Sequence, residues 1–365
     1  MAMKNNIYSS IEKYRKILIT GGCGFIGGNL IAKLLKRTNC EIFNIDKMGY
    51  ASDETIIQET INEKNNHRYN LFKIDLTDSK LIDSAIKKIK PNLVMHLAAE
   101  SHVDRSIDGP EIFIESNIVG TFNLLQSCLK YYKSELLINK NNFLFHHIST
   151  DEVFGSLGDS GSFNEETSYS PRSPYSSSKA ASDHLVRAWN VTYNLPTIIT
   201  NCSNNFGPYQ FPEKLIPLSI LKLLNGEEVP LYGDGMHIRD WLFVDDHISA
   251  LLMVAANGKV SETYCIGGHG EMTNKHIIYE ICKIMDKFNY KNAPHSNLIS
   301  FVEDRPGHDR RYAINPKKIK NELGWKVKND FSINLETTIR WYLENIDWCS
   351  KVLNNKDLTR KGLIK

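Results

Sequence analysis

A glycine-rich segment between a predicted strand and a predicted helix constrains the fold of this chain more than any other feature. Three glycines, spaced G-x-x-G-x-x-G, follow the strand-like run KILIT (16–20) and open the helical pattern FIGGNLIAKLLKR (25–37). The first glycine permits a tight turn, the second lets the backbone approach a pyrophosphate, and the third lets helix and strand pack closely. Free amides at the helix N-terminus then bind phosphate. The predicted dinucleotide-binding loop consists of Gly21, Gly24, Phe25, Ile26 and Gly27.

An acidic residue downstream strengthens this prediction, because a glycine pattern alone also fits an ordinary turn. Asp46 ends the second predicted strand, 19 residues after the last glycine. At about this distance a carboxylate accepts hydrogen bonds from the adenosine ribose, and it repels a 2′-phosphate, which favours NAD over NADP. Lys47 weakens the argument, since a cation could bind that phosphate. Asp75 and Leu76 follow the third strand and are predicted near the adenine, although a helix N-terminal turn explains them almost as well.

The pattern of strands and helices continues beyond this loop. Apolar strands are predicted at 16–20, 41–46, 70–74, 92–97, 143–149 and 195–202, and helices at 25–37, 78–89, 111–132 and after Pro174. Strands that alternate with helices indicate βαβ units, whose right-handed crossovers place all strand C-termini at one sheet edge. We therefore expect an α/β fold, a Rossmann-type doubly wound parallel sheet with a smaller C-terminal substrate-binding lobe. The expected NAD-binding domain is 14–200, with 242–268 returning to it, and the lobe is 201–241 and 269–350.

Composition excludes several classes of protein. The 365 residues carry 44 Lys and Arg against 42 Asp and Glu, and 41% are hydrophobic. These values exclude disordered and fibrous chains, and no basic stripe suggests a nucleic acid or an anionic membrane as partner. No run approaches the roughly 20 apolar residues of a membrane helix. The N-terminal residues lack the apolar core of a secretory signal.

The cysteines and histidines give no indication of a metal or of disulfides. Seven cysteines are scattered, odd in number and without a C-x-x-C pair, which favours a reducing, cytoplasmic location. Three groups could be imagined as metal ligands, but none has a recognised zinc spacing. They are His102 with Asp104, His146 with His147, and Asp245 to His247. We predict no metal site.

Tyr175 and Lys179 form the candidate catalytic pair. They lie four residues apart in a helix that begins near Pro174, so both side chains share one face. A lysine ammonium beside a phenol favours the phenolate, as does a nicotinamide cation, and the phenol can then act as a general base. A surface helix pair would have the same spacing. Their position after a dinucleotide loop and after the strand ending at Thr150 favours catalysis.

With this glycine spacing and this pair, the chain resembles the extended short-chain dehydrogenase/reductase superfamily. Within it, the chain is similar to the dTDP-glucose 4,6-dehydratase family from about Lys16 to Trp341. The stretches that carry the similarity are HLAAESHVDRSIDGP (96–110), STDEVFG (149–155), SNNFGPYQFPEKLIP (203–217) and DRPGHDRRY (304–312). The related 4-epimerases share the loop, the tyrosine and the lysine, but typically lack the pair Asp151-Glu152.

This resemblance implies an NAD-dependent lyase of nucleotide-sugar metabolism. Tyr175 would take the O4 proton while hydride leaves C4, which acidifies the C5 proton, and Glu152 would remove that proton. Asp151 would protonate the departing C6 hydroxyl, and hydride would return to C6. Thr150 would bind the sugar near O4. Like charge and burial push the pKa values of two adjacent carboxyl groups apart, which suits opposite roles.

The resemblance also implies binding residues. Beside the glycine loop, the cofactor residues would be Asp46, Lys47, Asp75, Leu76, Leu97, Ala98, Ala99, Ser116, Tyr175, Lys179 and Asn205. Substrate residues would be Ser101, Thr150, Asn204, Lys214, Leu215, Pro230, Tyr232, Arg239, Asn274, Arg305 and His308. Arg239 and Arg305 suit the diphosphate, because a guanidinium binds two oxygens at once.

The base, the oligomer and the reaction class leave alternatives. Thymidine and uridine differ by one methyl, worth about 1–3 kcal/mol, so another nucleotide hexose such as UDP-glucose remains open. A nucleotide-sugar 4-epimerase is the second enzyme reading, and a cofactor-binding regulatory protein is the non-enzymatic one. The family resemblance implies a homodimer built from 111–132 and the helix after Pro174. Its candidate apolar contacts are Ile114, Ile118, Leu125 and Leu185.

Overall fold

A parallel seven-stranded sheet forms the centre of the computed structural model, which describes residues 7–135, 143–288 and 290–353. The strand order is β10-β6-β5-β4-β1-β2-β3. The strands are β1 (Lys16–Thr20), β2 (Glu41–Asp46), β3 (Tyr69–Lys73), β4 (Leu93–His96), β5 (Leu144–Thr150), β6 (Thr197–Cys202) and β10 (Thr263–Ile266). The order reverses at β1, which pairs with both β2 and β4. The predicted doubly wound α/β sheet is confirmed.

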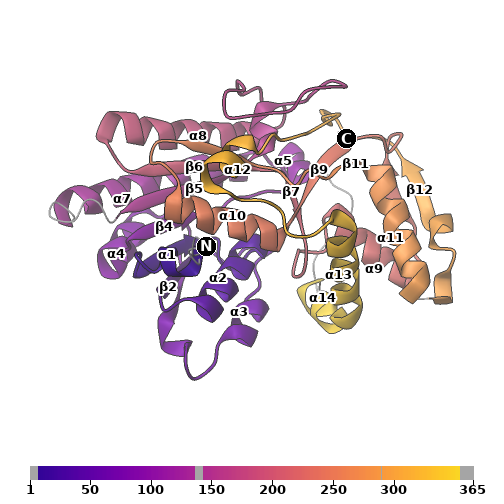
Figure 1. Ribbon diagram of the computed structural model, residues 1–365, viewed down its shortest axis with the longest axis horizontal. Coiled ribbons are helices and arrows are strands. Elements are labelled where there is room, and N and C mark those ends of the chain that lie inside the picture. Colours follow the sequence, from indigo (N-terminus) through magenta and orange to yellow (C-terminus); the bar gives the residue numbers. More distant parts are fainter. Residues whose placement is uncertain (1–6, 136–142, 289, 354–365) are drawn as a thin grey trace, which may run out of the picture.

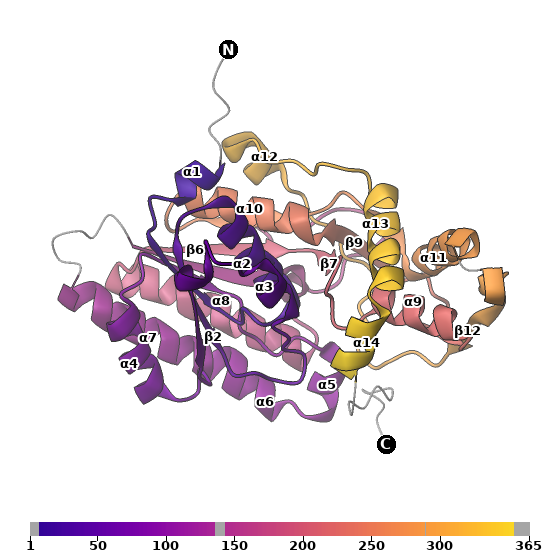
Figure 2. The same cartoon turned by 90° about the horizontal axis from the view of Figure 1, so that it is seen from below.

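Helices cover both faces of this sheet, which is why its central strands are buried on both sides. On one face lie α1 (Ile7–Ile11), α2 (Phe25–Arg37), α3 (Thr55–Thr60), α10 (Val244–Asn257) and α12 (Lys317–Leu323). On the other lie α4 (Ser79–Ile89), α7 (Gly120–Glu135) and α8 (Pro174–Tyr193). Figure 2 shows the three layers, with α1, α10 and α12 above the strands and α4, α7 and α8 below. Every residue of β5 and β6 is buried.

The C-terminal part packs around its own core beside the sheet (Figure 1). A three-stranded sheet contains β7 (Asn204–Phe206), β9 (Ile238–Phe243) and β11 (Glu271–Thr273), and a two-stranded one pairs β8 (Val229–Tyr232) with β12 (Ile299–Val302). The helices there are α9 (Leu215–Asn225), α11 (Asn274–Phe288), α13 (Phe331–Glu344) and α14 (Ile346–Leu353). The short helix α5 (Val103–Asp108) follows β4 and faces this part of the chain.

The single helix expected at 111–132 is interrupted. The structure has α6 (Glu111–Phe113), a π-helical turn over Ile114–Val119, and then α7. Inside the turn, Asn117 is buried and forms hydrogen bonds with both the backbone N–H and the carbonyl of Glu100, at 2.8 and 3.0 Å. It also donates to Ser178 Oγ at 2.8 Å. These contacts draw the helix toward the loop after β4, and π-turns of this kind often occur at functional sites.

Leu125, one of the four apolar residues expected at a dimer contact, is not available for one. Leu125 is fully buried within its own subunit, in the core between α7 and the sheet, because its side chain points inward from the helix. Ile114 is 45% exposed, as a contact residue must be, whereas Ile118 and Leu185 are half-buried.

None of the helices within the described ranges combines the length and apolar character that crossing a bilayer requires.

Candidate active site

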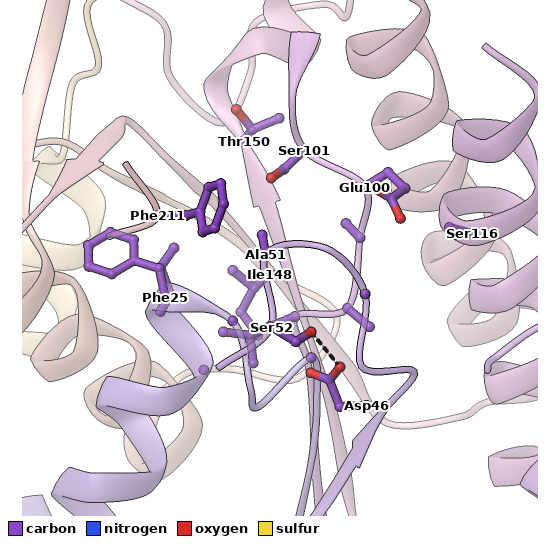
Figure 3. A pocket seen from close by; sticks show the side chains of 18 of the residues that line it. Phe25, Asp46, Ala51, Ser52, Glu100, Ser101, Ser116, Ile148, Thr150 and Phe211 are labelled. Atoms are coloured by element: carbon purple, nitrogen blue, oxygen red, sulfur yellow. Dashed lines mark hydrogen bonds between the residues drawn. The ribbon is translucent and has the colours of Figure 1, made fainter. Parts of the chain in front are cut away.

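A pocket of about 360 Å³ opens at the C-terminal edge of the main sheet, where the strand order reverses between β1 and β4. Open α/β sheets bind ligands at such points. All sixteen predicted cofactor residues line this pocket, together with Ser101, Thr150, Glu152, Asn204 and Lys214. Figure 3 shows Asp46 hydrogen-bonded to Ser52 at one end of the pocket and Thr150 at the other.

The glycine turn leaves room for a ligand against the backbone. Gly21 has φ +71°, and a Cβ there would lie 2.7 Å from the backbone of Ala98. A Cβ on Gly27 would lie 2.3 Å from the carbonyl oxygen of Gly21, so both glycines are required by close packing. Helix α2 starts at Phe25, and no side chain caps its N-terminus. Its first backbone amides therefore face the pocket without a side-chain acceptor. This cradle fits a pyrophosphate.

Asp46 is fixed at the end of β2. Its Oδ2 accepts a hydrogen bond from the Cys23 N–H at 2.9 Å, and its Oδ1 accepts from the Met48 N–H at 2.8 Å. Ser52 donates to the same Oδ1 at 2.9 Å. A carboxylate has about four acceptor sites, so it can still accept from a ribose hydroxyl.

Lys47 is paired within the protein. Its ammonium lies 2.6 Å from the Glu100 carboxylate and donates to Ser116 Oγ at 3.0 Å. Because Glu100 compensates this cation, Lys47 offers less attraction to a 2′-phosphate than its sequence position suggested. The residues present therefore fit NAD, and Glu100 is a pocket residue that our sequence reasoning missed, although it lies inside the quoted stretch 96–110.

Tyr175 and Lys179 enter the pocket from the first turns of α8. Ser173 caps this helix through a reciprocal capping box with Ser176, and Pro174 occupies the first turn. Lys179 Nζ donates to the carbonyl oxygen of Ile148 at 3.0 Å. Both side chains are buried.

Burial dominates the electrostatics of this pair. The pKa of Tyr175 lies well above its ordinary value, first because burial disfavours the phenolate and then because of the charge on Glu152. Burial lowers the pKa of Lys179, which the nearby Asp183 opposes. In the protein alone, burial outweighs the help that an ammonium gives a phenolate.

The two adjacent acids begin a 3-10 turn directly after β5. Asp151 is 1% exposed, and its pKa is raised well above the ordinary value by burial, then by Glu152 and Asp240. Glu152 lines the pocket, and its pKa is raised by burial against three cations, Arg305, Arg239 and Lys214, that lower it. Asp151 is thus held protonated more strongly, as a general acid requires.

All three cations have protein partners. Arg239 is buried, donates to the carbonyl oxygen of Asp309 at 2.9 Å, and lies over the Tyr312 ring at 4.3 Å. Arg305 forms an ion pair with Asp104 from α5. Lys214 Nζ donates to the carbonyl oxygen of Ser101 at 3.1 Å.

The other predicted substrate residues lie outside the lining of the pocket. Leu215 and Asn274 begin α9 and α11, and Pro230 and Tyr232 belong to β8. His308 donates to or accepts from Asp304 at 2.6 Å.

Three residues that line the pocket were missed by sequence reasoning: Tyr50, Phe211 and Glu213. Tyr50 donates to Glu213 at 2.7 Å and meets Phe211 edge to face, contacts between loops that no local pattern indicates.

One cluster of His and Asp side chains was not considered from the sequence. The rings of His237 and His308 stack with their centroids 3.7 Å apart and 12° between their planes. His237 Nε2 lies 3.2 Å from Asp304 Oδ2, and His308 Nδ1 lies 2.6 Å from the other oxygen, Oδ1. Lone pairs of parallel rings do not converge on a single point, as the ligands of one metal ion must. The cluster is better described as two imidazoles sharing one carboxylate.

Comparisons with known proteins agree with this site. The family model described as GDP-mannose 4,6 dehydratase matches residues 18–338. The dTDP-glucose 4,6-dehydratase of Salmonella typhimurium is 52% identical, with 92% of this chain and 95% of the relative covered. That of Neisseria meningitidis is 50% identical, with 93% and 96% covered.

Solved structures give the same result. The dTDP-glucose 4,6-dehydratase of Bacillus anthracis, in complex with NAD, is 40% identical with a TM-score of 0.80, covering 92% of this chain and 99% of that one. The enzyme of Streptomyces venezuelae, with NAD and dTDP bound, is 38% identical with a TM-score of 0.83 and the same coverage. The chain belongs to the NAD-dependent dTDP-glucose 4,6-dehydratase family of the Rossmann-fold dehydratases.

Proposed function

We propose that this protein converts dTDP-glucose to dTDP-4-keto-6-deoxy-glucose. The observation that carries the proposal is the placement of Glu152 and Tyr175 in one pocket whose glycine cradle and Asp46 fit NAD, with Asp151 buried next to Glu152 outside the pocket lining. A 4-epimerase needs the tyrosine but has no use for a second acid and base. Bound NAD supplies a hydride acceptor for C4 and returns the hydride at C6.

The side chains perform the proton transfers. Tyr175 takes the O4 proton as C4 is oxidised, and the ketone makes the C5 proton acidic. Glu152 removes that proton, and Asp151, held protonated by burial, gives its proton to the departing C6 hydroxyl. Thr150, at the end of β5, donates to Asp151 Oδ1 at 3.3 Å and accepts from the Glu152 N–H at 3.2 Å.

The nucleotide sugar is proposed to lie between the NAD-binding part (14–200) and the C-terminal segments (201–241 and 269–350). Arg239 and Arg305 are proposed to bind its diphosphate, with Lys214 nearby. The charges of all three cations lower the pKa of Glu152, so they lie close enough to it to support a site where the diphosphate and the reacting sugar meet.

The test is a substrate comparison. Purified protein with NAD is incubated with dTDP-glucose, UDP-glucose or GDP-mannose, and products are identified by NMR. We expect a 4-keto-6-deoxy product and fastest turnover with dTDP-glucose. A C4 epimer as the product would reject this proposal in favour of the epimerase reading, and preference for UDP-glucose would reject only the base.

A substitution at Asp46 tests cofactor choice. Asp46→Asn keeps the size of the side chain but removes the charge that accepts from ribose and repels a 2′-phosphate. We expect NAD affinity to fall about 10–100-fold, the effect of losing one charged hydrogen bond, and the preference over NADP to shrink. Fluorescence titration of both cofactors measures this, with the exposed Asp159→Asn as control. Equal use of both cofactors by the unmodified protein would contradict the role given to Asp46.

We also propose a homodimer. Ile112, Ile114, Val119 and Phe122 are each at least 39% exposed on the α6–α7 segment, and Val191 on α8 is 79% exposed. Because α7 and α8 pack side by side, these residues can form one apolar patch, which a two-fold axis would cover with its own copy. Light scattering should give about twice the chain mass of 41.7 kDa. A monomeric mass at micromolar concentration would end this proposal.

A reducing, cytoplasmic location is proposed as well. All seven cysteines are free and buried, which suits a compartment where disulfides do not form.

A further inference from the structure

The segment between β2 and α3 forms one wall of the cofactor pocket. Lys47 and residues 49–52 of this segment line the pocket. Met48 inside it has φ +58°, a left-handed conformation that is uncommon for a bulky side chain. Such a conformation persists only where surrounding contacts impose it. The contacts that hold this wall therefore help to decide how firmly a cofactor is bound.

Asp53, next to this wall, joins it to the glycine turn. Its backbone N–H donates to the carbonyl oxygen of Cys23 at 2.7 Å. The N–H of the same cysteine donates to Asp46 Oδ2 at 2.9 Å, and Ser52 donates to the other oxygen of that carboxylate at 2.9 Å. These hydrogen bonds link the wall, the glycine turn and the carboxylate that is predicted to bind the ribose.

The side chain of Asp53 reaches the C-terminal helix α14. Trp348 Nε1 donates to Asp53 Oδ2 at 2.9 Å, although the two residues are 295 positions apart in the chain. The acceptor is a carboxylate and the tryptophan is buried, so this is a charge-assisted hydrogen bond with little competition from water. Neither residue belongs to the lining of the pocket that the described residues form. A contact outside the pocket therefore holds one end of its wall.

Aromatic packing fixes the Trp348 indole in this position. Its ring centroid lies 5.1 Å from that of Trp341 on α13, with the planes at 70°, and 5.6 Å from that of Tyr209, with the planes at 81°. The Tyr209 hydroxyl donates to Glu59 on α3 at 2.5 Å. Figure 2 shows α14 continuing from α13. These C-terminal helices thus meet the NAD-binding part at α3 and at Asp53 just before it.

We propose that Trp348 and Asp53 are positioning residues that retain NAD, because their hydrogen bond ties the pocket wall 47–52 to α14 and slows release of the cofactor. The inference rests on the proposed function. A reaction that takes a hydride from C4 and returns it to C6 ends with the cofactor in its starting state. NAD then has no need to leave between turnovers, and slow release keeps the pocket loaded for the next sugar.

The test measures cofactor release with no sugar present. NADH is the fluorescent probe, since it shares the adenosine and pyrophosphate of NAD. Protein loaded with NADH is mixed with a large excess of NAD, and the loss of bound-NADH fluorescence gives the release rate. Trp348→Phe keeps an aromatic ring but removes the N–H. We expect release to become about tenfold faster, the lower end of what one charged hydrogen bond contributes.

The matched control is Trp325→Phe. Trp325 is also buried, and its indole donates to Ser249 on α10 at 2.9 Å, outside the lining of the pocket. Both variants should lower the Tm, but only Trp348→Phe should accelerate release. With dTDP-glucose, Trp348→Phe should raise the KM for NAD by a similar factor and leave kcat at saturating NAD unchanged. Release of NADH at the unmodified rate from Trp348→Phe would overturn the proposal.

A double-mutant cycle tests the hydrogen bond itself. Asp53→Ala should also accelerate release, and adding Trp348→Phe to it should have no further effect, because the acceptor is already gone. Additive effects would show that the two residues act separately and would reject the proposal.

A variant at Thr55 keeps the test decisive if Trp348→Phe does not fold. Thr55 Oγ1 donates to Asp53 Oδ1 at 2.9 Å, and Thr55→Val removes this contact while leaving the bond to Trp348. Release should be fast in Asp53→Ala and unchanged in Thr55→Val, and equal rates in the two would reject the role of Trp348. Failure of the proposed function is distinct, since the unmodified protein would then form no 4-keto-6-deoxy product.

Discussion

Replacing Tyr175 with phenylalanine is expected to lower turnover of dTDP-glucose by about 10²–10⁴-fold, the usual effect of removing a general base. The phenylalanine ring preserves the buried contacts of this side chain, including the edge-to-face contact with Phe113, so the protein should stay folded. What is lost is the group that takes the O4 proton, and oxidation at C4 cannot proceed without it. Product formation measured by NMR gives the rate.

The matched control is Tyr279→Phe, which removes a hydroxyl from a tyrosine that is 37% exposed on α11. It should leave turnover unchanged. If Tyr175→Phe kept turnover within tenfold of the unmodified protein, another group would have to take the O4 proton, and the assignment of Tyr175 would be wrong.

Replacing Glu152 with glutamine is the second large effect, and it separates elimination from oxidation. The amide keeps the size of the side chain but cannot accept the C5 proton, so release of dehydrated product should fall by about 10²–10⁴-fold. In deuterated water the unmodified protein should give product with deuterium at C5, and the variant should give neither product nor exchange at C5. NMR of the recovered sugar nucleotide measures both.

Glu336→Gln on α13 serves as the control, since its carboxylate pairs with Arg340 at the surface. Product from the unmodified protein that contained no solvent deuterium at C5 would rule out Glu152 as the base. Such a result would leave the role of Tyr175 untouched, because oxidation at C4 precedes the step at C5.

Much of the fold followed from local pattern. The predicted strands agree with the observed ones to within about two residues, because each is a short apolar run between turns and both sheet faces are covered. The glycine loop and Asp46 were predictable for a similar reason, since their spacing reflects one βαβ unit. The cofactor residues taken from the family resemblance line one pocket, and their individual roles remain predictions.

What escaped prediction depends on contacts between distant segments. The π-turn exists because Asn117 bonds to the backbone of Glu100 and to Ser178, and the helical apolar pattern of 111–132 contains no sign of it. Pairing of Lys47 with Glu100, and of Tyr50 with Glu213, likewise joins residues far apart in the chain. The burial that raises the pKa of Tyr175 likewise depends on the whole fold.

The ion pair between Arg305 and Asp104 has a consequence for ligand discrimination. The two residues are 201 positions apart in the chain, yet the fold holds the carboxylate permanently at the guanidinium. Under the proposal that Arg305 binds the substrate diphosphate, the incoming anion would compete with this carboxylate, whose effective concentration at the guanidinium is high. A ligand with several charged oxygens would then bind in preference to a neutral sugar, and Asp104 would contribute to selectivity for nucleotide-linked hexoses.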